Sequence, residues 1–77
     1  MELKITRYPN GNIQYERYLI NGKRHREDGP AFIKYWLNGN VELEYYYTNG
    51  VLNRNDGPAI VWYDDNNWVE RDLNGNQ

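Results

Sequence analysis

The chain has 77 residues, of which 11 are acidic and nine basic, and its formal net charge is −2 at pH 7. This length allows one domain near the lower limit for a self-supporting core, and so balanced a charge favours neither binding nor mimicry of nucleic acid. Because the chain has no cysteine and a single histidine, His25, we predict no disulfide, no metal site of the Cys/His type and no cofactor.

Strands joined by turns are expected along the whole chain. Three hairpins are predicted from runs with strand-like alternation: 2–8 with 13–20, 31–37 with 41–48, and 59–64 with 68–73. Asn10-Gly11 and Asn38-Gly39 predict two-residue type I′ turns, which need a positive φ at both central positions. Loops 21–30 and 49–58 join the hairpins. The predicted fold is all-β, a single antiparallel meander of about six strands in sequential order.

The chain also repeats itself with a period of about 28 residues, which is typical of a repeat array. Comparison of residues 8–31 with residues 36–59 gives 12 identities in 24 positions. The recurring residues predicted to form structural turns are Asn10, Gly11, Asp28, Gly29 and Pro30 in the first copy, and Asn38, Gly39, Asp56, Gly57 and Pro58 in the second. The sequence thus predicts one domain, 1–77, built from three β-hairpin repeats at approximately 3–30, 31–58 and 59–77.

Alternation with a period of two assigns the side chains to two predicted faces. The predicted core face holds the odd-numbered apolar residues: Leu3, Ile5, Ile13, Tyr15, Leu19, Ala31, Ile33, Tyr35, Leu37, Val41, Leu43, Tyr45, Tyr47, Ala59, Val61, Tyr63, Val69 and Leu73. No helix is expected to cover either face, so we expect the sheet to curl on itself, to pair with a second copy, or to lie against a partner.

The other predicted face mixes acidic with large aromatic residues and is our candidate protein-binding surface. Its proposed binding residues are Glu16, Tyr18, Phe32, Trp36, Glu42, Glu44, Tyr46, Trp62 and Glu70, and Lys34 and Asp72 accompany them. Tyrosine and tryptophan dominate the energetics of interfaces, and the glutamates favour a basic partner surface. Cross-strand packing alone is the alternative explanation for these aromatics. Direct binding of nucleic acid is disfavoured because the carboxylates would repel phosphate.

Catalytic and metal-binding interpretations are weaker. His25 lies among charged residues, but Asn53 takes its place in the second copy and no serine or cysteine completes a nucleophilic set, so we expect a loop residue and no enzyme. Asp28 and Asp56 are expected to cap turns, with Arg26 and Arg54 pairing with them or with a strand end. The acidic run at 64–67 lacks the spaced ligands of a calcium loop, and a hairpin turn is expected there.

The segment Asn-Gly-Lys-Arg-His-Arg-Glu-Asp-Gly-Pro-Ala at 21–31, followed by Tyr35 and Asn38-Gly39, resembles the MORN group of repeats. In particular it is similar to a variant found in phage and giant-virus proteins and in antitoxin-like bacterial proteins. Its longer period and its Asp-Gly-Pro-Ala turn depart from standard MORN repeats, which weakens any transfer of membrane-lipid binding. The resemblance implies an elongated sheet used for protein contacts and implies no reaction.

These observations favour a protein-binding repeat module. Its most concrete form, which the resemblance implies, is a small phage or mobile-element inhibitor that occludes a host defence enzyme or toxin. The alternatives are a self-associating scaffold, including a homodimer, and a small-ligand or lipid binder. No apolar run approaches the length of a membrane span, and Met1 is followed by Glu2 rather than by a signal peptide. We therefore expect a cytoplasmic protein, in the host cytoplasm if it is viral.

Overall fold

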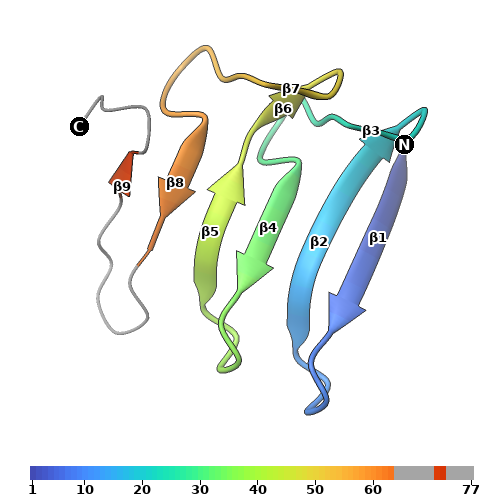
Figure 1. Ribbon diagram of the computed structural model, residues 1–77, viewed down its shortest axis with the longest axis vertical. Coiled ribbons are helices and arrows are strands. Elements are labelled where there is room, and N and C mark those ends of the chain that lie inside the picture. Colours follow the sequence, from blue (N-terminus) through green and yellow to red (C-terminus); the bar gives the residue numbers. More distant parts are fainter. Residues whose placement is uncertain (64–70, 73–77) are drawn as a thin grey trace.

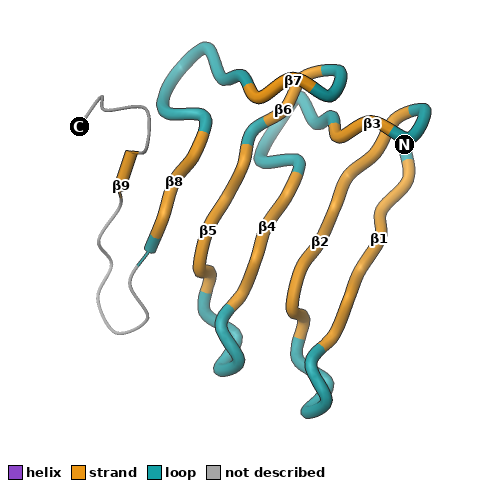
Figure 2. Tube along the Cα trace, in the orientation of Figure 1, coloured by secondary structure: helices purple, strands orange, loops and turns teal. Residues whose placement is uncertain are grey.

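The computed structural model describes residues 1–63 and 71–72. Within these residues the chain forms strands and no helix, which confirms the all-β prediction (Figures 1 and 2). The strands are β1 (Glu2–Arg7), β2 (Ile13–Ile20), β3 (Lys23–Arg24), β4 (Phe32–Tyr35), β5 (Val41–Tyr45), β6 (Tyr47–Thr48), β7 (Val51–Leu52), β8 (Ile60–Trp62) and β9 (Arg71–Asp72). The main sheet has the order β1-β2-β4-β5-β8-β9 with every described pair antiparallel, so the predicted sequential meander is confirmed.

The Asn-Gly turns are of two kinds, and the two-residue kind lies elsewhere than predicted. At Asn10-Gly11 and Asn38-Gly39 only the glycine has a positive φ, 92° and 98°. Tyr8 donates its N–H to the carbonyl of Asn12, so the first of these loops has three residues rather than two. The predicted two-residue type I′ turn is therefore wrong at these sites. It is found instead at Asn21-Gly22 and Asn49-Gly50, where both residues have a positive φ.

The type I′ turns make the loops between the main strands more regular than expected. The first connects β2 to β3, which pairs back onto β2, and the second connects β6 to β7 as a separate two-stranded sheet. The predicted strand 41–48 is consequently interrupted between β5 and β6. The two loop regions lie side by side along one end of the main sheet (Figure 1), where Arg26 donates its N–H to the carbonyl of Tyr47.

The predicted division into a core face and a polar face is wrong. Leu3 pairs with Tyr18 and Ile5 with Glu16, so odd residues of β1 share a face with even residues of β2. The parity changes again between the following strands, because their registers pair odd residues with even ones. The exceptions lie beyond the two register shifts, where Arg7 pairs with Ile13 and Tyr35 with Val41. One resulting face, the tyrosine–glutamate face, holds Leu3, Ile5, Glu16, Tyr18, Ile33, Tyr35, Glu44, Tyr46, Val61 and Tyr63. The other, the phenylalanine face, holds Tyr15, Phe32, Lys34, Leu43, Tyr45 and Trp62.

The core lies in the middle of the sheet and uses both faces. Its buried apolar residues, among those described, are Ala31, Phe32, Ile33, Ala59 and Val61. Three residues assigned to the core from the sequence, Leu3, Ile5 and Leu37, are instead exposed, because the first two lie on an edge strand and the third lies in a turn. The molecule is a slab of 32 × 32 × 15 Å, so it is one layer thick. No helix within the described residues could cross a membrane.

Candidate binding surfaces

The residues predicted to form one binding surface are divided between the two faces. Glu16, Tyr18, Glu44 and Tyr46 belong to the tyrosine–glutamate face, whereas Phe32 and Trp62 belong to the phenylalanine face. The glutamates Glu16 and Glu44 therefore do not surround the tryptophans, and the predicted acidic rim around an aromatic patch is wrong for these two residues.

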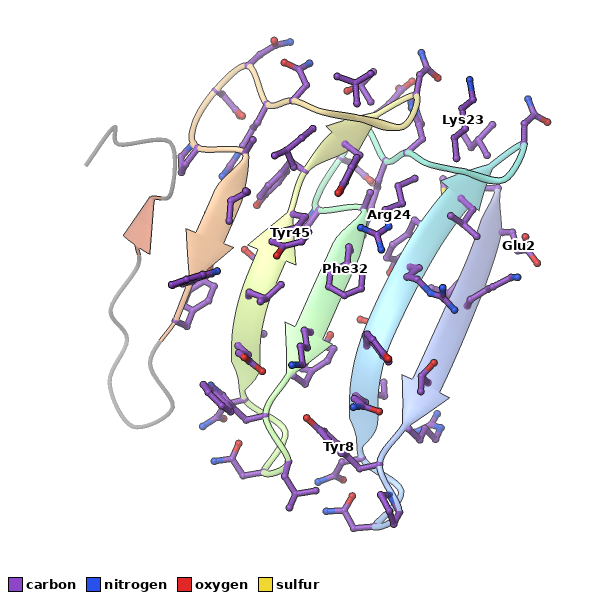
Figure 3. All side chains as sticks on the ribbon, in the orientation of Figure 1. Glu2, Tyr8, Lys23, Arg24, Phe32 and Tyr45 are labelled. Carbon is purple, nitrogen blue, oxygen red and sulfur yellow. The ribbon has the colours of Figure 1, made fainter. Side chains whose placement is uncertain are left out.

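Phe32 is a core residue rather than a contact residue, since only 8% of it is exposed. Its ring lies 5.7 Å from that of Tyr15 and 5.4 Å from that of Tyr45, measured between centroids. The guanidinium of Arg24 covers it at 4.6 Å and also lies 5.2 Å from the ring centroid of Tyr47. Figure 3 shows Arg24 beside Phe32 and Tyr45 at the loop end of the sheet. This cluster joins the loop region to the sheet by cation–π and apolar contacts.

An apolar hollow lies next to Trp62. It has a volume of about 270 Å³ and is lined by Trp36, Glu42, Leu43, Trp62 and Tyr63. Trp62 is 41% exposed although its strand, β8, has a neighbouring strand on each side. The sequence therefore identified Trp36, Glu42 and Trp62 correctly as neighbours, although it did not identify Leu43, which it assigned to the core.

Two other features shape the hollow. Glu42 is placed at its margin by a bulge in β5, and its carboxylate lies 3.5 Å from the ammonium of Lys34. The indole Nε1 of Trp36 is buried and has no hydrogen-bond partner among the described residues. Leaving a buried N–H unpaired costs free energy.

On the tyrosine–glutamate face, the same contact occurs twice, at positions that are 28 residues apart. The hydroxyl of Tyr35 donates to Glu16 Oε1 at 2.5 Å, and the hydroxyl of Tyr63 donates to Glu44 Oε1 at 3.0 Å. Burial raises the pKa of Tyr35 well above its ordinary value, and the Glu16 carboxylate raises it further. One carboxylate oxygen of each glutamate thus accepts a hydrogen bond within the chain, and this bond links neighbouring strands of the sheet.

The Asp-Gly-Pro-Ala loops also form matching contacts. Arg26 donates to Asp28 at 3.2 Å and to the carbonyl of Pro30 at 3.3 Å, and its guanidinium lies 4.0 Å from the ring centroid of Tyr18. Arg54 contacts Asp56, Pro58 and Tyr46 in the same way, at 3.3, 3.1 and 3.9 Å. The predicted pairing of each arginine with the aspartate of its loop is confirmed. The stacking on tyrosine was not predicted.

A Cβ added to Gly29 would come within 3.2 Å of the Arg26 guanidinium, and one added to Gly57 within 3.1 Å of that of Arg54. A side chain at either position would therefore press on the arginine packed against it, and neither glycine has a positive φ. A groove of about 540 Å³ separates the two loops, and Asp28 and Asp56 lie along it. Each aspartate is paired with the arginine two residues before it, so a structural role in its loop accounts for its recurrence.

His25 lies in a structural position. It is 8% exposed, and its Nδ1 accepts the backbone N–H of Asn49 at 2.9 Å. The bond ties the first loop to the type I′ turn of the second, where Gly50 also donates its N–H to the carbonyl of Arg24. Because the two bonded residues lie far apart in the chain, nothing in the local sequence indicates the contact. Since the lone pair of Nδ1 is engaged, that nitrogen is not placed to act as a base.

Several predicted positions fall outside the described residues. Glu70, Val69, Leu73 and the acidic run at 64–67 belong to this group, and for Asp72 only the backbone is described. No protein-family model matches the chain, and neither a curated protein nor a solved structure matches it either. The resemblance to MORN repeats remains an expectation from the sequence.

Proposed function

We propose that this chain is a protein-binding module that receives an apolar side chain of its partner in the hollow between Trp36 and Trp62. The observation that carries the proposal is the partial exposure of Trp62 beside an apolar hollow of about 270 Å³. A concave apolar site with tryptophan at its margin is the setting in which interfaces concentrate their binding energy.

The shape of the molecule supports a protein rather than a small ligand as partner. The two long extents of 32 Å outline a face of roughly 1,000 Å², whereas a stable interface covers roughly 800 Å² of each partner. The hollow itself is smaller than most sites for drug-sized ligands, which enclose roughly 300–1,000 Å³. Occlusion of a host defence enzyme or toxin is the specific form of this proposal, and it rests on the sequence resemblance.

The test uses capture from a bacterial lysate, identification of the captured protein, and titration calorimetry with that protein in purified form. Trp62→Ala should weaken the purified complex by about 2 kcal/mol or more, which corresponds to about 30-fold in Kd. Val51→Ala is the matched control, because Val51 is an exposed apolar residue on β7, away from the main sheet. Equal affinities of the wild type and the Trp62→Ala variant would refute the assignment of the hollow.

A further inference from the structure

The apolar side chains of β1 are more exposed than those at the equivalent positions of the next two repeats. Ile5, Ile33 and Val61 occupy equivalent positions, yet Ile5 is 41% exposed whereas Ile33 and Val61 are 8% and 1% exposed. Likewise Leu3 is exposed, whereas its equivalents Ala31 and Ala59 are buried. The difference arises because β4 and β8 each have a strand on both sides, while β1 is bordered by β2 alone within the described chain.

In β4 and β8, the edge that is equivalent to the free edge of β1 is paired with a neighbouring strand. β4 is covered by β2, and β8 is covered by β5. The next strand in this series is β9, which lies at the opposite edge of the sheet from β1 (Figure 1). We propose that β9 of one copy pairs with β1 of a second copy, so that copies join end to end in one continuous antiparallel sheet.

The inner pairs fix the register of this junction. Tyr15 pairs with Lys34, and in the next repeat Leu43 pairs with Trp62. The next step in the series pairs Arg71 with Thr6 of the second copy, and Asp72 with its Ile5. In this register the two described residues of β9 would lie against Thr6 and Ile5, as β2 lies against Ile33 and β5 against Val61, and burial of Ile5 would favour the junction.

Charge complementarity at the junction supports a second copy as the occupant. Asp72 is equivalent to Glu16 and Glu44, and Arg7 is equivalent to Tyr35 and Tyr63. Within the chain these positions form the two tyrosine–glutamate hydrogen bonds. Between copies the same positions would bring an aspartate to an arginine, a charge-assisted pair. Arg7 is exposed and bonds only to the carbonyl of Gly11 among the contacts described, so its guanidinium has further donors.

This association goes beyond the proposed binding function and has a distinct signature. A contact between two different edges is heterologous, and it continues until the array closes or the chains run out. Light scattering at increasing concentration should therefore give a mass that rises past that of a dimer. A mass that stays at the monomer, or that stops at the dimer, would overturn the proposal.

Engineered disulfides test the register directly, because the natural chain has no cysteine. Mixing the Thr6→Cys variant with the Arg71→Cys variant under mild oxidation should give a cross-linked heterodimer. The control mixes Glu2→Cys with Arg71→Cys: position 2 lies about 13 Å farther along β1, beyond the reach of a disulfide. Equal cross-linking in both mixtures would contradict the register.

Charge reversal tests the pair at the junction. Arg7→Asp alone and Asp72→Arg alone should each weaken the association about tenfold or more, and the double reversal should restore it. We expect Arg7→Asp to fold, because Arg7 is exposed on an edge strand. Circular dichroism of each monomeric variant checks that it is folded. Failure of the double reversal to restore association, with all variants folded, would eliminate this pair and the register that places it.

Discussion

Ile5 and Ile33 occupy equivalent positions but differ in burial, so the same substitution, Ile→Ala, should lower the free energy of unfolding by different amounts. Ile→Ala removes three carbons, and at about 0.8 kcal/mol per buried methylene the transfer term is about 2.4 kcal/mol. At Ile33, which is 8% exposed, the cavity raises the loss to about 3–4 kcal/mol. At Ile5, which is 41% exposed, water fills the space and the loss should be about 1 kcal/mol.

Urea unfolding followed by circular dichroism measures both losses, at protein concentrations low enough to keep the chain monomeric. A domain of this size has about 4–12 kcal/mol of total stability. If Ile33→Ala leaves too little folded protein, Ile33→Val is the substitute, with an expected loss of about 1 kcal/mol. Equal losses at the two positions would refute the argument, because they would mean that β1 is as well covered as β4.

Three further predictions test contacts that hold the turns and strands. His25→Ala should cost about 1–3 kcal/mol in urea unfolding, because the N–H of Asn49 loses its acceptor. Gly39→Ala should cost about 1–2 kcal/mol by the same measurement, because its φ of 98° is unfavourable for a residue with a Cβ although no atom obstructs it. Tyr35 has a raised pKa in the folded state, so its contribution is fully present below the unfolded pKa of about 10 and is lost as the pH rises through the folded pKa. Unfolding measured from pH 9 upward should show this loss in the wild type, and less of it in Tyr35→Phe.

The strand order was predictable because it depends on local signals. Most of the main strands alternate apolar and polar residues, and Asn-Gly or Asp-Gly-Pro segments mark most of the connections between them. Short connections place sequential strands side by side. The recurrence of the repeat strengthened that prediction, since Asp28 and Asp56 with their neighbours mark the same loop twice. Both loops do adopt matching contacts, with Arg26 and Arg54 paired to the aspartates as expected.

The faces were not predictable to the same degree, because a face depends on register. Alternation states which residues of one strand lie together, but it does not state which residues of the next strand join them. Any register that pairs an odd residue with an even one moves Glu16 to the side of Ile5. The candidate site changed for this reason: Trp36 and Trp62 still line one hollow, while Phe32 became part of the core and Glu16 bonded to Tyr35.

The type of each turn was equally difficult to predict from the dipeptide alone. Asn-Gly occurs at both kinds of turn, and the residues that precede it differ. Pro9 and Leu37 become the first residues of three-residue loops, whereas Ile20 and Thr48 pair directly with Lys23 and Val51 across two-residue turns. The hydrogen bond of His25 to Asn49 joins two such loops, and it depends on how one repeat packs on the next.

The packing of one repeat on the next predicts the effect of adding a repeat. Duplicating residues 31–58 after Pro58 would insert another strand pair between β5 and β8, in the positions that β4 and β5 now hold. The inserted equivalent of Ile33 would have a strand on both sides, as Ile33 and Val61 have.

In a linear array each added unit contributes its own stability and one more interface. The free energy of unfolding in urea and the slope of its dependence on urea should therefore both increase, since the slope follows the surface exposed on unfolding. A duplication that instead lowers stability or unfolds in two separate transitions would contradict this expectation. It would show that the end strands β1 and β9 depend on contacts that the recurrence of the repeat does not describe.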